Sequence, residues 1–340
     1  MQFAARIFTI AKDPEHPEQF QDACHVDAAG GIAAVADGVA STLFSGQWAE
    51  LLTQAIVADA LDPADQEGFA CWLKKRREAW SAQIDVSGLA WFQKAKLPLG
   101  AFCTLLWVRL LPEEESPPPT PPSQRLQAFA LGDSCLLHVR GGEAIHTFPI
   151  QQSPQFDADP LAVGSLDLGR DQLLNFRCLE ERCLLGDLLV LCTDAVAQWA
   201  LRRCESGCPP AWDDYWHMTE QAWREEIVAL REQGLMRYDD ATLLLLRVVA
   251  QCAETCVDAQ PTAPIEAAEP QPASAEELAP LAGQPSDTAA PDWAATLKSL
   301  SDRAYAGLDQ VSQQMLRGLG RLKQKALEKY REQFRPDKKE

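Results

Sequence analysis

The sequence predicts an α+β fold in which two antiparallel β-sheets pack face to face, with helices on their outer sides. The predicted helices are grouped between blocks of strands, whereas a doubly wound parallel sheet would alternate the two. The predicted strands are short apolar runs bounded by turns rich in Gly, Pro and Asp. A hydrophobic fraction of 46% in 340 residues is ample for such a core, whether the chain forms one large domain or two smaller ones.

The first hundred residues are expected to contain strands followed by two helices. Apolar residues at helical spacing over 48–56 predict a helix that begins after Ser41, interpreted as its N-cap. Residues 66–84 predict a second amphipathic helix, with aromatic residues on one face and a basic, solvated face opposite. The predicted strands of this part are 6–12, 23–26 and 32–36.

From Gly100 to about residue 250 the sequence is rich in predicted strands. Residues 112–122 are too rich in proline to pair in a sheet, and we expect a disordered loop that joins two strands. The predicted strands are 101–111, a pair within 126–140 around the Gly132-Asp133 turn, 144–149, 173–179, 188–192 and 242–249. The predicted helices are 196–203 and 211–233.

The composition changes after residue 250. Residues 251–291 are rich in Ala, Pro and Glu, contain no Lys or Arg, and predict a flexible acidic linker. Residues 292–335 predict a long amphipathic C-terminal helix with a basic end, capped by Asp292 and ended by Pro336. Its apolar face needs a partner, so we expect it to dock on its own first domain, on another protein or on a second copy. A membrane surface is a less favoured alternative.

Charge and cysteine usage exclude several classes of protein. The net charge of −18 argues against nucleic-acid binding, which needs clustered cations. No apolar run reaches the ~20 residues of a membrane span, and the N-terminus lacks a signal-peptide pattern. The 11 cysteines favour the reducing cytoplasm; Cys103, Cys183 and Cys192 lie in apolar strands and are interpreted as small core residues. The pairs Cys204/Cys208 and Cys252/Cys256 lack the histidines that would support a zinc site.

Aspartates stand where predicted strands end. Asp37 follows the apolar run 32–36, Asp194 follows 188–192, Asp133 follows a third strand, and Asp239-Asp240 precedes a fourth. One such residue alone would indicate only a strand and an Asp-Gly turn. Four together predict a carboxylate cluster for hard cations such as Mg²⁺ or Mn²⁺. Two such ions about 4 Å apart can deprotonate a shared water and hold a phosphoryl group during its hydrolysis.

Six segments occur in an order that resembles a known family. They resemble the successive motifs of the type 2C, metal-dependent protein serine/threonine phosphatases, and the resemblance extends over 1–250 but not over the linker or C-terminal helix. The segments are 21–22, 34–38 (Ala-Val-Ala-Asp-Gly), 100–104, 131–134 (Leu-Gly-Asp-Ser), 186–194 and 239–243 (Asp-Asp-Ala-Thr-Leu).

The resemblance implies an α-β-β-α sandwich with the metals at one end of the two sheets. It implies that Asp37 bridges two metals and that the Gly38 carbonyl binds the second. Asp194 and Asp239 would complete the ligands of the first metal, and Asp22 would act on the second metal or its waters.

The same resemblance implies the activity and its partners. The chain would use two Mn²⁺ or Mg²⁺ ions to dephosphorylate serine or threonine in proteins without a phosphoenzyme, opposing a serine/threonine kinase in signal transduction. Asp133 matches a position that supports a weaker third metal in some members.

The chain departs from the family pattern where substrate binds. Members usually carry a phosphate-binding arginine before the first acidic motif, but 16–20 contains none; His16, Lys12 or a residue from elsewhere are the candidates to replace it. Gln21, Ala195 and Cys135 are further departures, and none removes a metal ligand. The missing arginine motivates one alternative, a non-catalytic module that binds phosphoproteins or a partner. A hydrolase of small phosphoesters is another.

Overall fold

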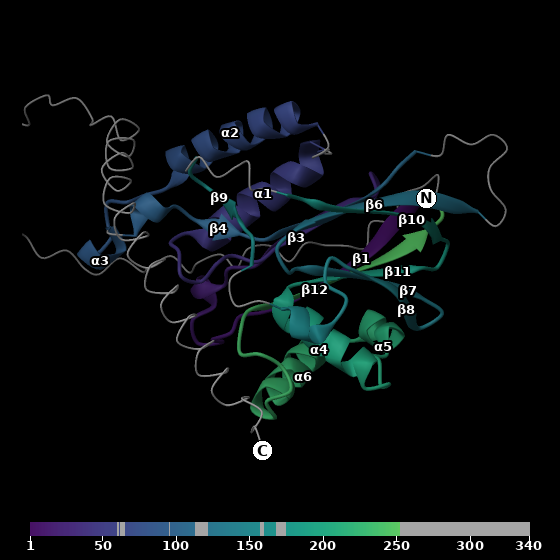
Figure 1. The fold of residues 1–340 in the computed structure, drawn as a ribbon. Helices are drawn as coiled ribbons and strands as arrows, with labels where there is room; N and C mark the ends of the chain where they lie inside the picture. Colours follow the sequence, from purple (N-terminus) through teal and green to yellow (C-terminus); the bar gives the residue numbers. More distant parts are fainter. Residues whose placement is uncertain are drawn as a thin grey trace, which may run out of the picture. The chain divides into compact units, whose positions relative to one another are not determined.

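The computed structural model describes residues 1–59, 61, 65–94, 96–112, 122–156, 160–167 and 175–251 (Figure 1). The strands are β1 (Gln2–Ile10), β2 (Ala23–Asp27), β3 (Ile32–Ala36), β4 (Phe102–Cys103), β5 (Leu105–Leu110), β6 (Ser123–Leu131), β7 (Cys135–Arg140), β8 (Glu143–Phe148), β9 (Val163–Gly164), β10 (Arg177–Leu184), β11 (Leu188–Cys192) and β12 (Ala241–Val249). The α-helices are α1 (Ser45–Asp59), α2 (Gln66–Gln83), α3 (Trp91–Lys94), α4 (Asp194–Glu205), α5 (Trp212–His217) and α6 (Glu220–Glu232).

Two five-stranded antiparallel sheets form the centre of the molecule. One has the strand order β1-β12-β11-β7-β8 and the other β10-β6-β5-β3-β2, while β4 and β9 form a separate pair. Helices α1 and α2 cover the outer side of the second sheet, and α4, α5 and α6 cover the outer side of the first (Figure 1). This arrangement confirms the predicted α+β sandwich.

Three apolar layers hold the four layers of structure together. The layer between the sheets contains Val35, Leu106 and Leu244, among others. One outer layer packs α1 and α2, through side chains such as Trp48, on the second sheet. The other packs the remaining helices, through side chains such as Trp223, on the first sheet.

Strand β11 shows why its sequence is a continuous apolar run. Leu188 and Val190 face the helices, whereas Leu189 and Leu191 face the other sheet. All four are buried, because both faces of this central strand are covered. Each leucine buried in this way contributes about 1.5–3 kcal/mol.

Several predicted helix and strand boundaries were wrong. Helix α1 begins at Ser45, and Ser41 is an exposed turn residue rather than its N-cap. The predicted helix 211–233 is two helices, α5 and α6, because the Thr219 hydroxyl accepts a hydrogen bond from the Ala222 N–H and starts a new helix.

Two strand predictions were also wrong. The predicted strand 101–111 divides at Thr104 into β4 and β5, which belong to different sheets. The strand expected over 173–179 lies further along the chain, as β10 (Arg177–Leu184). Its full length was missed because β10 is an edge strand and carries many polar residues. The predicted pair within 126–140 exists as β6 and β7, but its turn passes from one sheet to the other.

Two other predictions fall mostly or wholly outside the described residues. These are the loop 112–122, of which 113–121 are not described, and the linker and C-terminal helix after residue 251. The boundaries 1–250, 251–291 and 292–335 therefore stay predictions. None of the helices in the described ranges has both the length and the apolar character that crossing a bilayer requires.

Candidate metal centre

Asp37 extends from the end of β3, and the chain holds its backbone firmly. The Asp37 N–H donates to the Thr104 hydroxyl at 3.1 Å, and the Thr104 N–H donates to the Asp37 carbonyl at 2.8 Å. The Thr104 hydroxyl also lies 2.8 Å from that of Ser134, next to Asp133. Thr104 therefore connects the positions of two predicted metal ligands, Asp37 and Asp133.

Gly38 lies where three segments meet too closely for a side chain. Its N–H donates to the Gln21 carbonyl at 3.2 Å, and it forms an isolated bridge with Cys103. A Cβ at this position would lie 2.6 Å from the Gln21 carbonyl oxygen and 3.0 Å from the Ser45 Cβ. Only glycine fits without a backbone shift.

Asp22 is buried and oriented by two hydroxyls. Its Oδ2 accepts hydrogen bonds from the hydroxyls of Thr193 and Thr242, each at 2.9 Å. These threonines lie beside each other, because the Thr193 N–H donates to the Thr242 carbonyl. The hydrogen bonds fix Asp22 at the end of two central strands of the first sheet, where β11 ends and β12 begins.

Asp194 occupies the first turn of α4, where the positive end of the helix dipole favours a carboxylate. Its Oδ2 pairs with the Arg237 guanidinium, whose side chain is 36% exposed. Arg237 stands two residues before Asp239, so this ion pair connects α4 to the segment that leads into β12.

The side chains of Asp239 and Asp240 differ in burial and in hydrogen bonding. Asp240 is buried and accepts the N–H groups of Lys12 and Gln21 at 2.7 and 2.8 Å, which fastens the N-terminal loop. Asp239 is only half-buried, and its backbone carbonyl accepts a hydrogen bond from Arg231. Asp239 is thus the member of the pair whose side chain remains accessible to a ligand.

The electrostatics show that the predicted aspartates approach one another. Burial, and then the charges of Asp22, Asp194, Asp133 and Asp239, raise the pKa of the Asp37 carboxyl well above its usual value. Burial, and then Asp240, likewise raise the pKa of Asp22. Carboxylates from five separate segments therefore act on one another at this end of the sandwich.

Two carboxylate oxygens of this group are suited to a cation. Among the described residues, Asp22 Oδ1 and Asp194 Oδ1 are buried without a hydrogen-bond partner. Buried oxygens in proteins almost always have a partner, and a divalent ion bound by oxygen would provide one. The donor set of carboxylates and a backbone carbonyl fits Mg²⁺ or Mn²⁺.

Three of these aspartates do not come together as closely as the ligands of one ion. In the part of the chain that the structure describes, the three donor groups within 4.8 Å of one another are His138, Cys183 and Asp187, at the other end of β11 from Asp194.

The sequence did not reveal the residues that support these aspartates. Thr104, Thr193 and Thr242 each follow or begin an apolar strand, but their hydroxyls act across segments distant in sequence. Arg237 was also missed, although its position two residues before Asp239 could have indicated a role beside that aspartate.

One of the residues proposed to replace the missing arginine is His16. It is exposed and pairs with Glu18 at 3.1 Å.

The protein phosphatase 2C family model matches residues 17–232. No curated protein matches the chain.

Solved structures that are similar to this chain include three bacterial proteins. The catalytic domain of the serine/threonine phosphatase PstP with two manganese ions is 17% identical, with 73% of this chain and 99% of that chain covered and a TM-score of 0.46. PppA, described as a regulatory component of the type VI secretion system (T6SS) in Pseudomonas aeruginosa, is 17% identical, with 73% and 98% covered and a TM-score of 0.46. Stp1 from Staphylococcus aureus is 12% identical, with 74% and 96% covered and a TM-score of 0.47.

The family model covers more than half of the chain and includes the segments that carry Asp22, Asp37, Asp133 and Asp194. The chain belongs to the protein phosphatase 2C family, a family of protein serine/threonine phosphatases.

Proposed function

We propose that this protein is an active phosphatase that hydrolyses phosphoserine and phosphothreonine in proteins with two Mn²⁺ or Mg²⁺ ions. The feature that supports it most is the gathering of Asp37 with Asp22, Asp194, Asp133 and Asp239 at one end of the sandwich, where their charges act on the Asp37 carboxyl. A fold that gathers this much negative charge gains stability when cations bind there.

The aspartates hold the ions in this proposal. Asp37 and the Gly38 carbonyl, with Asp194 and Asp239, are the principal ligands; Asp22 supports the second ion, and Asp133 a third where one binds. When bound, the ions polarise the phosphoryl oxygens and lower the pKa of a water so that it attacks phosphorus at neutral pH.

The surrounding residues of the chain orient these ligands. Thr104 holds the backbone of Asp37 on both sides. The hydroxyls of Thr193 and Thr242 occupy Oδ2 of Asp22, which leaves its Oδ1 for an ion or its waters. Such fixed supporting contacts are what keeps a metal site in its productive geometry.

Arg237 is assigned to the substrate phosphate in place of the arginine missing from 16–20. Arg237 pairs with Asp194, and its side chain remains 36% exposed. A cation on Asp194 would weaken that ion pair and leave the guanidinium for an incoming phosphate, which arginine binds through two parallel hydrogen bonds.

The substrates are proposed to be proteins rather than small phosphoesters. Two hollows of about 590 and 570 Å³ are lined mainly by residues of α4, α5 and α6 and by the N-terminal loop with α6. Neither is lined by the proposed metal ligands, so neither is a small-molecule pocket at the proposed centre. The choice of proteins as substrates rests on the family that the chain belongs to. The partners would be phosphoproteins modified by a serine/threonine kinase, in the cytoplasm.

Phosphate release from a phosphothreonine peptide tests the proposal. With Mn²⁺ the full chain should turn over the peptide, and excess chelator should abolish the turnover. Asp37→Asn should lower kcat/KM by at least about 100-fold, which corresponds to about 2.7 kcal/mol of transition-state stabilisation. Ordinary turnover by this variant, or in chelator, would refute the proposed chemistry.

A non-catalytic phosphoprotein-binding module is the second candidate, favoured by the absence of arginine in 16–20. Calorimetry with the same peptide separates the two. A binding module would bind the peptide in the presence of Mn²⁺ and leave it intact for hours, whereas the phosphatase would release inorganic phosphate during the titration.

A further inference from the structure

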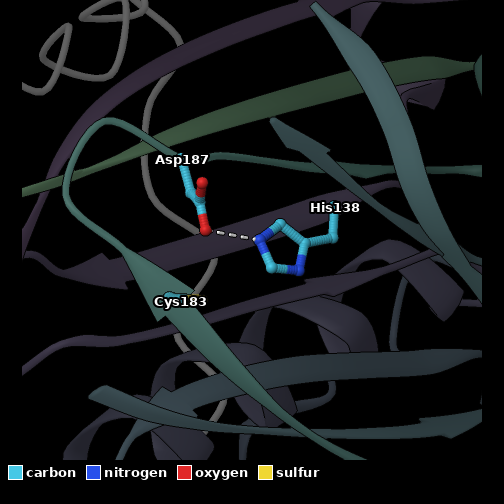
Figure 2. A group of neighbouring side chains, drawn as sticks. All are labelled: His138, Cys183 and Asp187. Carbon is cyan, nitrogen blue, oxygen red and sulfur yellow. Dashed lines mark hydrogen bonds and ion pairs between the residues drawn. The ribbon is translucent and has the colours of Figure 1, made fainter. Parts of the chain in front are cut away.

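A second group of metal-ligating side chains lies at the other end of β11 from Asp194. His138 comes from β7, Cys183 from β10 and Asp187 from the turn between β10 and β11, and all three are buried. Figure 2 shows His138 and Asp187 directed toward each other, with Cys183 on the strand that leads into the turn carrying Asp187. One donor atom from each lies within 4.8 Å of the other two.

The position of this group connects the two sheets. Strand β10 is at the edge of one sheet, and β7 and β11 are in the other, so the β10–β11 turn crosses between them. From Asp187 to Asp194 the chain advances seven residues, roughly 20 Å at about 3.3 Å per residue of strand. The group is therefore separate from the proposed phosphatase centre.

The donor types select a particular class of metal. An imidazole nitrogen, a thiol sulfur and a carboxylate oxygen together suit Zn²⁺, whereas Mg²⁺ and Mn²⁺ prefer oxygen alone. Zinc bonds of about 2.0–2.3 Å in a tetrahedron place ligand atoms about 3.3–3.8 Å apart. His138 Nε2 lies 2.8 Å from Asp187 Oδ2, about 0.5 Å less than the shorter of these separations, and the Cys183 sulfur lies within 4.8 Å of the ligand atoms of both.

Two of the three proposed ligands make the supporting hydrogen bonds that are usual around zinc ligands. His138 Nδ1 lies 2.6 Å from Glu181 Oε2, which fixes the ring and leaves Nε2 toward the centre of the group. Arg140 donates to both oxygens of Asp187 at 2.8 and 2.7 Å, and the Leu184 N–H donates to Oδ2 at 2.8 Å. A histidine with a carboxylate on its second nitrogen, and a ligating carboxylate with its own donors, are typical of the surroundings of a zinc ion.

Zinc binding at this group would release protons. Cys183 would bind Zn²⁺ as a thiolate, so the ion would replace the proton on Sγ, together with any proton on His138 Nε2. Each released proton offsets one positive charge of the ion. Burial, and then Asp187 and Glu181, raise the pKa of the Cys183 thiol.

We propose that His138, Cys183 and Asp187 bind one Zn²⁺ ion, which fastens the two sheets at the end opposite the phosphatase centre. Cys183 is then a ligand as well as a core residue.

Titration of the full chain with Co²⁺ as a probe tests this site in the presence of saturating Mn²⁺. Thiolate bound to Co²⁺ gives a near-ultraviolet charge-transfer band that carboxylate sites cannot give. We expect this band at one Co²⁺ per chain and its loss when Zn²⁺ is added. Cys183→Ala should remove the band and weaken Zn²⁺ binding at least tenfold. Cys178→Ser, at an exposed position of the same strand, should retain both.

The wild-type chain alone can overturn the proposal, whether or not a variant folds. Absence of the band together with no Zn²⁺-dependent rise in Tm would show that the group is only a network of ion pairs. An equal band in Cys183→Ala would assign the thiolate to another cysteine. Mn²⁺-dependent phosphatase activity should be similar in Cys183→Ala and the wild type, so the result is independent of the proposed function.

Discussion

Asp37 lies where burial and four other carboxylates disfavour its negative charge. A carboxyl group whose pKa is higher in the folded than in the unfolded state reduces stability as pH rises above its unfolded pKa of about 3.9. The metal-free protein is therefore destabilised by this group at neutral pH.

Asp37→Asn should raise the Tm of the metal-free protein at pH 7 by a few degrees, since about 1 kcal/mol corresponds to about 2–4 °C in a domain of this size. At pH 4 the difference should shrink, because the wild-type carboxyl is protonated there. Saturating Mn²⁺ should raise the Tm of the wild type by about 5 °C or more, as ~2.7 kcal/mol at 100 times Kd implies, and raise that of the variant less. A variant no more stable than the wild type in chelator would contradict this account of the charges.

Arg237 is the residue through which substrate affinity can be separated from metal binding. Arg237→Gln should raise KM for a phosphopeptide by about 10–100-fold, the range of a lost charge-assisted hydrogen bond of about 1.5–3 kcal/mol. The change in kcat should be smaller, and competitive inhibition by inorganic phosphate should weaken in parallel. Arg224→Gln, at an exposed position on α6, is the control. A normal KM with weaker Mn²⁺ binding would show that Arg237 only positions Asp194.

At the scale of elements, the connection between β3 and α1 depends on close packing at Gly38. A methyl group there would lie 2.6 Å from the Gln21 carbonyl oxygen. Gly38→Ala should therefore lower the free energy of unfolding by about 1–3 kcal/mol, because backbone must move to admit it. Urea denaturation measures this. Gly88→Ala is the matched control, since a Cβ at Gly88 meets nothing within 4 Å and should leave stability nearly unchanged. Equal stability of the two variants would mean that the connection is looser than the structure shows.

Elements that depend on local pattern could be predicted from the sequence, and those that depend on distant contacts could not. Strand β3 and helix α2 are where apolar runs and helical spacing placed them. The break between α5 and α6 was missed partly because the Met218 carbonyl accepts a hydrogen bond from Arg6, 212 residues away. Thr104 divides one apolar run because its hydrogen bonds are made to Asp37, which no local pattern reveals.

For the whole molecule, the grouping of helices predicted the sandwich, but not which strands are neighbours. Periodicity cannot show that β6 and β7 enter different sheets, since the chain is buried on both faces at the end of β6 and along most of β7. The aspartates of the site could be found because strand ends and motif order mark them. Arg237 and the threonines could not, because their roles arise only when the sheets bring distant segments together. The Zn²⁺ ligands were hidden for the same reason, with 45 residues separating His138 from Cys183.

The described domain contains everything that the proposed catalysis requires. Strands β1 and β12 pair along their whole lengths, from Gln2 with Val249 to Ile10 with Ala241, so the first sheet is complete before residue 250. All of the proposed metal ligands, and Arg237, also lie before that residue. Deleting residues 251–340 should therefore leave kcat/KM on p-nitrophenyl phosphate within about twofold of the full chain, a difference of about 0.4 kcal/mol.

The Tm of the truncated protein, measured alongside, shows whether its fold is intact. A folded truncated protein with much lower activity would mean that the C-terminal region takes part in catalysis; normal activity on the small ester but lower activity on a phosphoprotein would indicate that the region recruits substrates.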